Sequence, residues 1–217
     1  MFQAIGVHGP ELTPIASALM HGALVLLAAI MLAPFSRQQR SGWVPLAGLV
    51  VVVTALRVVM EPLPNIQPVT VTVLLVGACL GARRGVAFAV LVTLLSNAFI
   101  GDGWWTLFQA LGWSSVALLG AGLLEANRLR LPQLSVVSVL AAFVFGFVAS
   151  LSLLDSTMSL TDFFLLLFAG LPYDALHALG NLAVAVWFGP TIHGLLQDTT
   201  TSWMEMKPRG EPNGVEG

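Results

Sequence analysis

The stretch VTVTVLLVGACLGARRGVAFAVLVTLLSNAFI, at residues 69–100, decides how this chain folds. Two apolar runs, residues 69–82 and 86–100, flank the basic turn Arg83-Arg84-Gly85. Each run is shorter than the roughly 20 residues that carry a helix across a bilayer. The two runs therefore either cross a membrane as short helices or enter it and return to the same side.

The rest of the sequence has the composition of a membrane protein. Hydrophobic residues make up 57% and charged residues 9% of the 217 positions, whereas soluble domains carry roughly 25% charged residues. Longer apolar runs occupy residues 12–33, 44–60, 104–124, 134–154 and 172–196. We predict an all-α, multi-pass integral membrane protein of the plasma membrane. A net charge of −2 without a basic run argues against nucleic acid as a partner.

The cationic residues decide between the two interpretations of the short runs. Cationic loops stay on the cytoplasmic side of a membrane, whereas acidic residues have little influence. If both short runs cross, every Lys and Arg except Arg57 lies on one side, namely Arg37, Arg40, Arg83, Arg84, Arg128, Arg130, Lys207 and Arg209. The sequence therefore predicts a bundle of seven transmembrane helices, with the N-terminus outside and the C-terminus in the cytoplasm.

We expect this bundle to have three parts. Residues 1–42 hold an additional N-terminal transmembrane helix, which is retained because no cation precedes it, and a cytoplasmic loop. Residues 43–198 form a six-helix core, and residues 199–217 form a disordered cytoplasmic tail. Within the core, residues 163–170 follow the capping residues Ser159 and Asp162 and are too short to cross, so we expect a separate helix on the outer surface.

Small residues and the one cysteine have structural interpretations. Gly77, Gly81 and Gly85 recur at four-residue spacing. Such stripes let helix backbones approach closely in lipid, so we expect them to serve packing. Cys79 is the single cysteine, which excludes an intrachain disulfide and leaves no thiolate metal site.

Polar residues near the outer ends of the spans are candidate binding residues. Arg57 lies about one turn before the end of the second span, and a charge at this depth requires a partner. Glu61, four residues later, is one possible partner, and a ligand is the other. Asn65 and Gln67 lie in the following proline-rich connection, where turn formation and binding are equally consistent with their side chains.

The next outer turn adds an amide and an aromatic face. Trp105, Gln109 and Trp113 are spaced at i, i+4 and i+8 and share one side of a helix. Trp113 and Gln109 resemble a flat platform with a hydrogen-bonding group for a ring-shaped ligand, although a packed core tryptophan fits equally well. Trp104 has the position of an interfacial anchor, and Asn97 is the polar residue that precedes the turn.

The last span begins with a polar stripe. Asp174, His177 and Asn181 are spaced at i, i+3 and i+7, and polar groups inside a membrane are functional candidates. The structural alternative is a buried network in which Asp174 pairs with Arg57. Because all of these groups lie in the outer half, we expect an aromatic, polar pocket that opens to the outside.

These segments together resemble the substrate-binding S component of energy-coupling factor vitamin transporters. The resemblance runs from about Val44 to Leu196. It rests on the order of several short motifs, namely Arg57, Pro64-Asn65, Pro68-Val69-Thr70, Leu80-Gly81, Ser96-Asn97, residues 101–106, Gln109, Trp113, Leu171-Pro172, Asp174, His177 and Gly180-Asn181.

The resemblance implies a six-helix protein that is not an enzyme and holds no cofactor or metal. Such a protein captures a vitamin or precursor in an outward-facing pocket and associates with a transmembrane coupling subunit and two cytoplasmic ATPases. The aromatic outer turn makes a cobalamin-type compound the first ligand to consider. ATP hydrolysis falls to a partner, because the sequence has no Gly-rich phosphate loop followed by Lys-Ser or Lys-Thr.

Two other classes of function remain open from the sequence. Asp174 and His177 have a spacing that would suit an intramembrane enzyme, but His-Glu-x-x-His and Gly-x-Ser-x-Gly motifs are missing. A small membrane assembly or ion-path protein is the third class. A tightly held zinc ion would favour the enzyme, and a co-purifying vitamin would favour the transporter.

Overall fold

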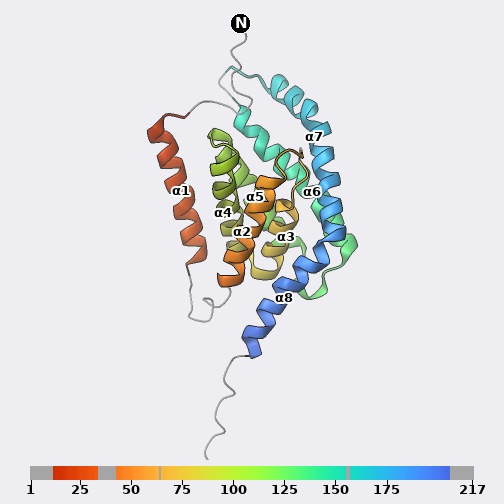
Figure 1. Cartoon of the computed structure of the whole chain (residues 1–217). Coiled ribbons are helices and arrows are strands. Elements are labelled where there is room, and N and C mark those ends of the chain that lie inside the picture. Colours follow the sequence, from red (N-terminus) through yellow and green to blue (C-terminus); the bar gives the residue numbers. More distant parts are fainter. Residues whose placement is uncertain (1–11, 34–42, 64, 155–156, 206–217) are drawn as a thin grey trace, which may run out of the picture.

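The computed structural model describes residues 12–33, 43–63, 65–154 and 157–205, and these residues form a bundle of helices without a strand (Figure 1). The helices are α1 (Pro14–Leu32), α2 (Trp43–Val59), α3 (Val69–Leu80), α4 (Ala82–Ile100), α5 (Trp104–Leu123), α6 (Leu131–Ser150), α7 (Leu160–Trp187) and α8 (Gly189–Glu205). Two 3₁₀ turns, η2 (Ala126–Arg128) and η3 (Leu151–Leu153), flank α6. The all-α prediction is confirmed for the described part of the chain.

Five of the described helices are long and apolar enough to cross a membrane: α1, α4, α5, α7, and α6 with its 3₁₀ extension. Two further apolar segments, Leu46–Val59 of α2 and Val69–Leu80, are shorter than these five helices. The stretch that decides the fold therefore forms two helices, α3 and α4, which meet at Gly81. Its φ of +88° is a conformation that glycine adopts without strain. The turn expected at Arg83-Arg84-Gly85 is wrong, because these three residues form the first turn of α4.

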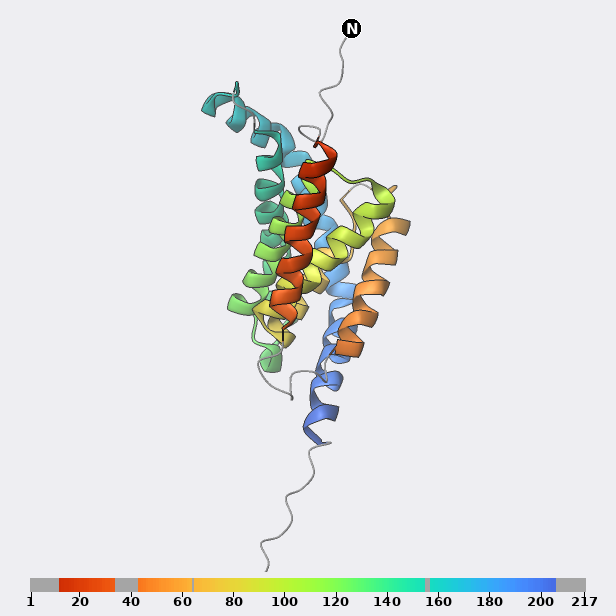
Figure 2. The same cartoon turned by 90° about the vertical axis from the view of Figure 1, so that its left-hand side faces the viewer.

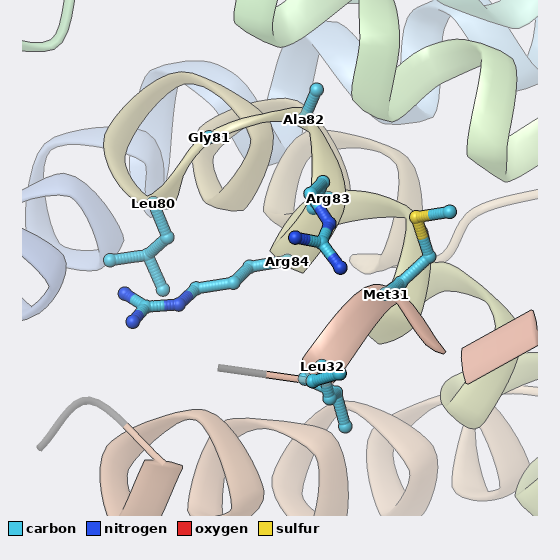
Figure 3. A pocket seen from close by; sticks show the side chains of 8 residues that line it. Met31, Leu32, Leu80, Gly81, Ala82, Arg83 and Arg84 are labelled. Carbon is cyan, nitrogen blue, oxygen red and sulfur yellow. The ribbon is translucent and has the colours of Figure 1, made fainter. Parts of the chain in front are cut away.

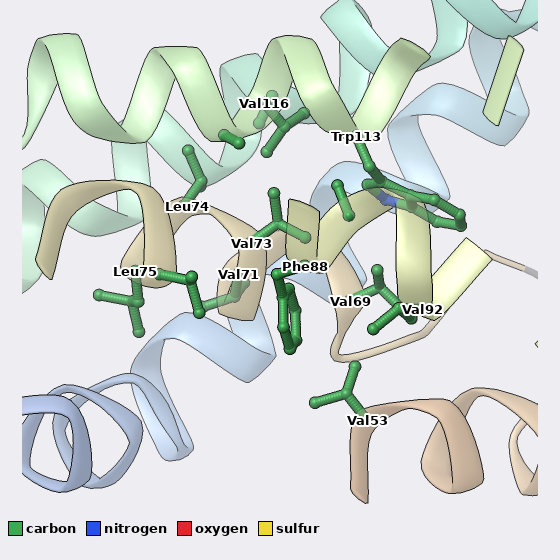
Figure 4. Packing of buried hydrophobic residues seen from close by; sticks show 14 of the residues in the cluster. Val53, Val69, Val71, Val73, Leu74, Leu75, Phe88, Val92, Trp113 and Val116 are labelled. Atoms are coloured by element: carbon green, nitrogen blue, oxygen red, sulfur yellow. The ribbon is translucent and has the colours of Figure 1, made fainter. Parts of the chain in front are cut away.

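The short helix α3 lies at the centre of the bundle. Every residue from Val69 to Gly77 is buried, and α4, α5 and α8 pack around the helix. Figure 4 shows Val71, Val73 and Leu74 among Phe88 and Val116 of the neighbouring helices. Twelve residues span about 18 Å, compared with a hydrocarbon core of about 30 Å. Protein rather than lipid therefore surrounds this helix.

Glycines bring the backbones of α3 and α5 into contact. A Cβ atom at Gly77 would lie 2.2 Å from the carbonyl oxygen of Ala117, and one at Gly120 would lie 2.1 Å from that of Leu74. A Cβ at Gly85 would meet Ala117 and the backbone of Gly77. Gly77 and Gly85 therefore serve close helix packing, as expected from their spacing. The same expectation for Gly81 is wrong, because a Cβ atom there would meet nothing within 4 Å and the residue forms the turn between the two helices.

The additional helix α1 packs on one side of the bundle against α4 (Figures 1 and 2). Leu24 and Ala28 of α1 are buried together with Val90 and Ala110. α2 also packs against α4. Helix α4 is thus the main neighbour of the N-terminal helix, and α5 also contacts it.

The last third of the chain differs from the sequence predictions in the bounds of its helices. α7 is one continuous helix of 28 residues that includes Pro172, so residues 163–170 are not a separate helix. Ser159 and Asp162 form the expected capping box, with the Ser159 hydroxyl 2.6 Å from the Asp162 carboxylate. Proline has no N–H for the helix hydrogen bond, and its ring clashes with the carbonyl group four residues earlier. Both effects can bend a helix without ending it, and the residues on both sides of Pro172 are helical. Figure 2 shows that the first turns of α7 lean away from the bundle.

The last predicted span, residues 172–196, is divided between two helices. α7 ends at Trp187 and α8 begins at Gly189, immediately before Pro190. Pro190 has no N–H to continue the hydrogen bonds of α7 but fits the first turn of a new helix, which accounts for the break. α8 then continues to Glu205, so residues 199–205 are helical where we expected disorder. Residues 206–217 of the predicted tail lie outside the described residues.

Candidate functional site

The buried side chain of Arg57 is the centre of the candidate site. It lies near the end of α2, is 4% exposed, and reaches α4 and α5. Its Nη1 atom donates to the Ser96 hydroxyl and, at 2.6 Å, to Oδ1 of Asn97. Its Nη2 atom donates to Oε1 of Gln109 at 3.2 Å. The guanidinium carbon lies 4.9 Å from the centre of the Trp113 ring. These five residues are called the Arg57 cluster below.

No carboxylate among the described residues forms an ion pair with Arg57. Glu61 is exposed. Asp174 packs against α6, where a Cβ atom at Gly146 would lie 2.0 Å from its carboxylate. Both carboxylate partners considered from the sequence are therefore wrong. The positive charge is held by neutral acceptors and an aromatic ring, and the Nε atom is buried without a hydrogen-bond partner.

An aromatic group continues the Arg57 cluster toward α7. Trp113 is 3% exposed, and its Nε1 atom donates to the Thr70 hydroxyl at 3.2 Å. Nε2 of His177 lies 2.9 Å from the same hydroxyl. The Phe145 ring lies 4.6 Å from the Trp113 ring and 5.3 Å, edge-on, from the His177 ring. Helices α2 to α7 thus contribute to one continuous group of buried polar and aromatic side chains.

A chain of hydrogen bonds connects the Arg57 cluster with the surface turn between α4 and α5. Asn97 donates to Gln109 at 2.9 Å and to the Thr106 hydroxyl at 2.7 Å. Thr106 in turn donates to Asp102 at 2.7 Å. The second oxygen of Asp102 lies 3.1 Å from Nε2 of His21, on α1. The N-terminal helix is therefore connected to the cluster through a carboxylate.

The structure brings together five of the residues predicted from the sequence, namely Arg57, Asn97, Gln109, Trp113 and His177. The remaining six form other contacts. Asn65 has a φ of 59° and donates to the carbonyl oxygen of Tyr173 at 3.1 Å, so it has the turn role that we considered. Asn181 donates to the carbonyl oxygen of Ser138 at 3.1 Å, while its own Oδ1 is buried without a partner.

In the contacts described, Trp104, Asp174 and Gln67 also lie apart from the Arg57 cluster. Trp104 stacks edge-on against Phe108, with 5.1 Å between the ring centres. The Trp105 ring lies against Gly103, whose Cβ would be 2.0 Å away. Gln67 is half-buried in the connection between α2 and α3. The aromatic outer turn and the buried platform at Trp113 are thus different features of α5.

Sequence reasoning missed several residues that complete the site. Thr70, Ser96, Thr106 and Phe145 contact the predicted residues, and Asp102 and His21 extend the network. Hydroxyls inside helices commonly bond to their own backbone, as Ser96 does to the carbonyl oxygen of Val92. The hydroxyls therefore did not mark these residues as binding residues, although Thr70, Ser96, Asp102 and Thr106 lie within the motifs that carry the resemblance.

The chemistry of the site favours binding an anion. A buried guanidinium and amide groups attract a carboxylate or phosphate. The described residues contain no group of three His, Cys, Asp or Glu side chains that would hold a metal. Asp174 and His177 share a helix, but His177 contacts Thr70 whereas Asp174 contacts Gly146.

The fold and the site together describe a helical protein with membrane-length apolar helices and a buried cation. The chain belongs to DUF6580, a family of unknown function, whose family model matches residues 37–199. The matched segment begins after α1 and ends within α8. No curated protein and no solved structure matches the chain.

Proposed function

We propose that this protein is the substrate-binding membrane subunit of an energy-coupling factor transporter and captures a vitamin or cofactor precursor from outside the cell. The resemblance of the sequence to that family gives the class. The buried charge of Arg57, held without a carboxylate partner among the described residues, carries the proposal. A cation in a bundle interior attracts an anionic group more strongly than it would in water.

The proposed topology has seven spans, α1 to α7, in the plasma membrane, with the N-terminus outside. The loop cations support this orientation. It places the turn at Arg83 and Arg84 in the cytoplasm and the Arg57 cluster in the outer half of the bundle. The central position of α3 explains how a helix of 12 residues belongs to such a bundle.

The Arg57 cluster suggests which part of the solute it would hold. A carboxylate or phosphate would accept hydrogen bonds from the Nε atom of Arg57, which has no partner. The rings of Trp113 and Phe145 would pack against an adjacent planar group. A cobalamin-type compound remains the first candidate from the aromatic outer turn, and smaller carboxylated vitamins suit the buried cluster.

The connection between α2 and α3 is the proposed entrance. Asn65 bonds to the backbone of Tyr173, and a Cβ atom at Gly180 would lie 3.1 Å from the Cα atom of Ile66. These contacts attach the connection to α7 next to His177. Opening of this connection would expose the cluster to the outside, and the coupling subunit with its two ATPases would supply the energy for release.

The test begins with mass spectrometry of small molecules released from the detergent-purified protein. The solute found, or a panel of vitamins that includes cobalamin-type compounds, is then measured by calorimetry against the wild type and Arg57→Gln. We expect an anionic solute whose affinity falls at least about tenfold in Arg57→Gln, which corresponds to the loss of one charge-assisted contact. Arg130→Gln, a change at an exposed residue, is the matched control.

Two results would overturn this proposal. One is a wild-type protein that releases no solute and binds none of the panel. The other is equal affinity of the wild type and Arg57→Gln, because the cluster would then have no part in binding. A stoichiometric zinc ion in the purified protein would favour the enzyme class instead.

A further inference from the structure

A second candidate site lies at the opposite end of α4 from the Arg57 cluster. A hollow of about 300 Å³ separates the last residues of α1 from the turn between α3 and α4. Residues 31–33 line one side and residues 80–84 line the other. Figure 3 shows the guanidinium of Arg83 between this turn and Met31, and Arg84 extended past Leu80.

The described residues that line this hollow carry positive charge only, on Arg83 and Arg84. Arg83 and Arg84 are both in the first turn of α4, and its lining includes no carboxylate among the described residues. The Nη2 atom of Arg83 donates to the carbonyl oxygen of Ile30 at 2.5 Å, which positions its guanidinium at the end of α1. A guanidinium has five N–H groups and can serve several acceptors at once.

The surroundings of the two guanidinium groups combine charge with apolar surface. Met31, Leu32 and Leu80 contribute hydrocarbon to the same hollow. In the proposed orientation, the hollow lies where α1 leaves the membrane on the cytoplasmic side. Arginine recognises phosphate oxygens through paired N–H groups, and anionic lipid headgroups gather at basic pockets between helices on this side.

We propose that this hollow binds a phosphate group, either in the headgroup of an anionic membrane lipid or as free phosphate. The hollow is at the lower end of the volumes of small-molecule sites, which suits one phosphate with a few neighbouring atoms. The bound phosphate would connect the end of α1 with the start of α4. The proposal is independent of the solute captured at Arg57.

The experiment uses the full-length protein in a mild neutral detergent and measures thermal unfolding and native mass spectra. The probes are dioleoylphosphatidylglycerol, zwitterionic dioleoylphosphatidylcholine and inorganic phosphate. We expect the anionic lipid to bind at least about tenfold more tightly than the zwitterionic lipid, a preference that Arg83→Gln/Arg84→Gln removes. Arg128→Gln/Arg130→Gln, with the same loss of charge in another loop, should keep it.

The comparison of the probes distinguishes free phosphate from a lipid headgroup. A further variant tests the site in case the double arginine variant does not fold. Stabilisation by inorganic phosphate equal to that by the lipid assigns the site to free phosphate. Ala33→Trp fills the hollow and keeps both arginines, so it should also weaken binding. Equal losses in the two double variants, unchanged binding in Ala33→Trp, or no preference of the wild type for either anionic probe would overturn the proposal.

Discussion

The side chain of Arg57 is stabilised by dipoles instead of a counter-ion. Oxygen atoms of Ser96, Asn97 and Gln109 accept hydrogen bonds from it. Hydrogen bonds to a charged group contribute about 1.5–3 kcal/mol each, which offsets part of the free energy lost when the charge leaves water. A carboxylate partner would neutralise the site. Three uncharged acceptors leave the positive charge of the site without a neutralising partner.

The first prediction compares removal of the charge with removal of an acceptor. Arg57→Met removes the buried cation but leaves Oδ1 of Asn97 without its donor, so the two effects offset each other and we expect the free energy of unfolding to fall by only about 1 kcal/mol. Asn97→Leu keeps the cation and deletes its amide partner, so we expect a loss of roughly 3 kcal/mol. Thermal or denaturant unfolding in detergent measures both. A larger loss in Arg57→Met than in Asn97→Leu would assign Arg57 a structural role.

Among the helices, α3 and α5 show the closest approach of backbones in the described glycine contacts. Gly77 on one helix and Gly120 on the other lie against carbonyl oxygens, so neither position has room for a methyl group. Backbone atoms cannot turn aside as a flexible side chain does, and the helices would have to separate. This contact fixes the position of Trp113, two turns before Gly120 on α5, relative to Thr70 on α3.

A pair of glycines on α5 allows a matched test of this contact. Gly120→Ala would place its Cβ atom 2.1 Å from the carbonyl oxygen of Leu74, whereas Gly122→Ala would have nothing within 4 Å. We expect Gly120→Ala to lower the free energy of unfolding by about 2 kcal/mol or more because the helices are overpacked. Gly122→Ala should remain within about 0.5 kcal/mol of the parent. Similar melting temperatures for both variants would show that α5 does not pack this closely on α3.

For the molecule as a whole, the sequence predicted the helices better than it predicted their contacts. The apolar runs indicated most helices, and the run that ends at Ile100 has the observed bound before Gly101. The break expected at Arg83-Arg84-Gly85 lies instead at Gly81, because the positive φ of this glycine ends α3 earlier than the apolar run does. Pro172 was taken as a boundary and is internal, because a helix can bend at a proline and continue.

The sequence did not predict that Asn97 and Gln109 contact Arg57, for a different reason. Asn97 and Gln109 are 40 and 52 positions away, and both were candidates. A sequence gives the charge of Arg57 but not which distant polar groups face it. Opposite charges were the simplest expectation, and uncharged oxygens occupy those positions instead.

The orientation of the whole molecule leads to the third prediction. In a Cys79→Ser background, a cysteine at Thr157 should react with a membrane-impermeant thiol reagent applied to intact cells. Cysteines at Arg84 and Arg130 should react only after the cells are opened, because cationic loops remain in the cytoplasm. Labelling of the Arg84 position in intact cells would contradict the seven-span topology.

The shortness of α3 has a consequence for how the protein is made. A helix of 12 residues is too short to reach both surfaces of a bilayer by itself, and a backbone end in hydrocarbon has no water to bond to. In the proposed topology we therefore expect α3 not to leave the translocon as an independent segment. It would enter the lipid together with α4 as a hairpin, and its stable placement would wait until α5 and, later in translation, α8 have been synthesised and pack around it.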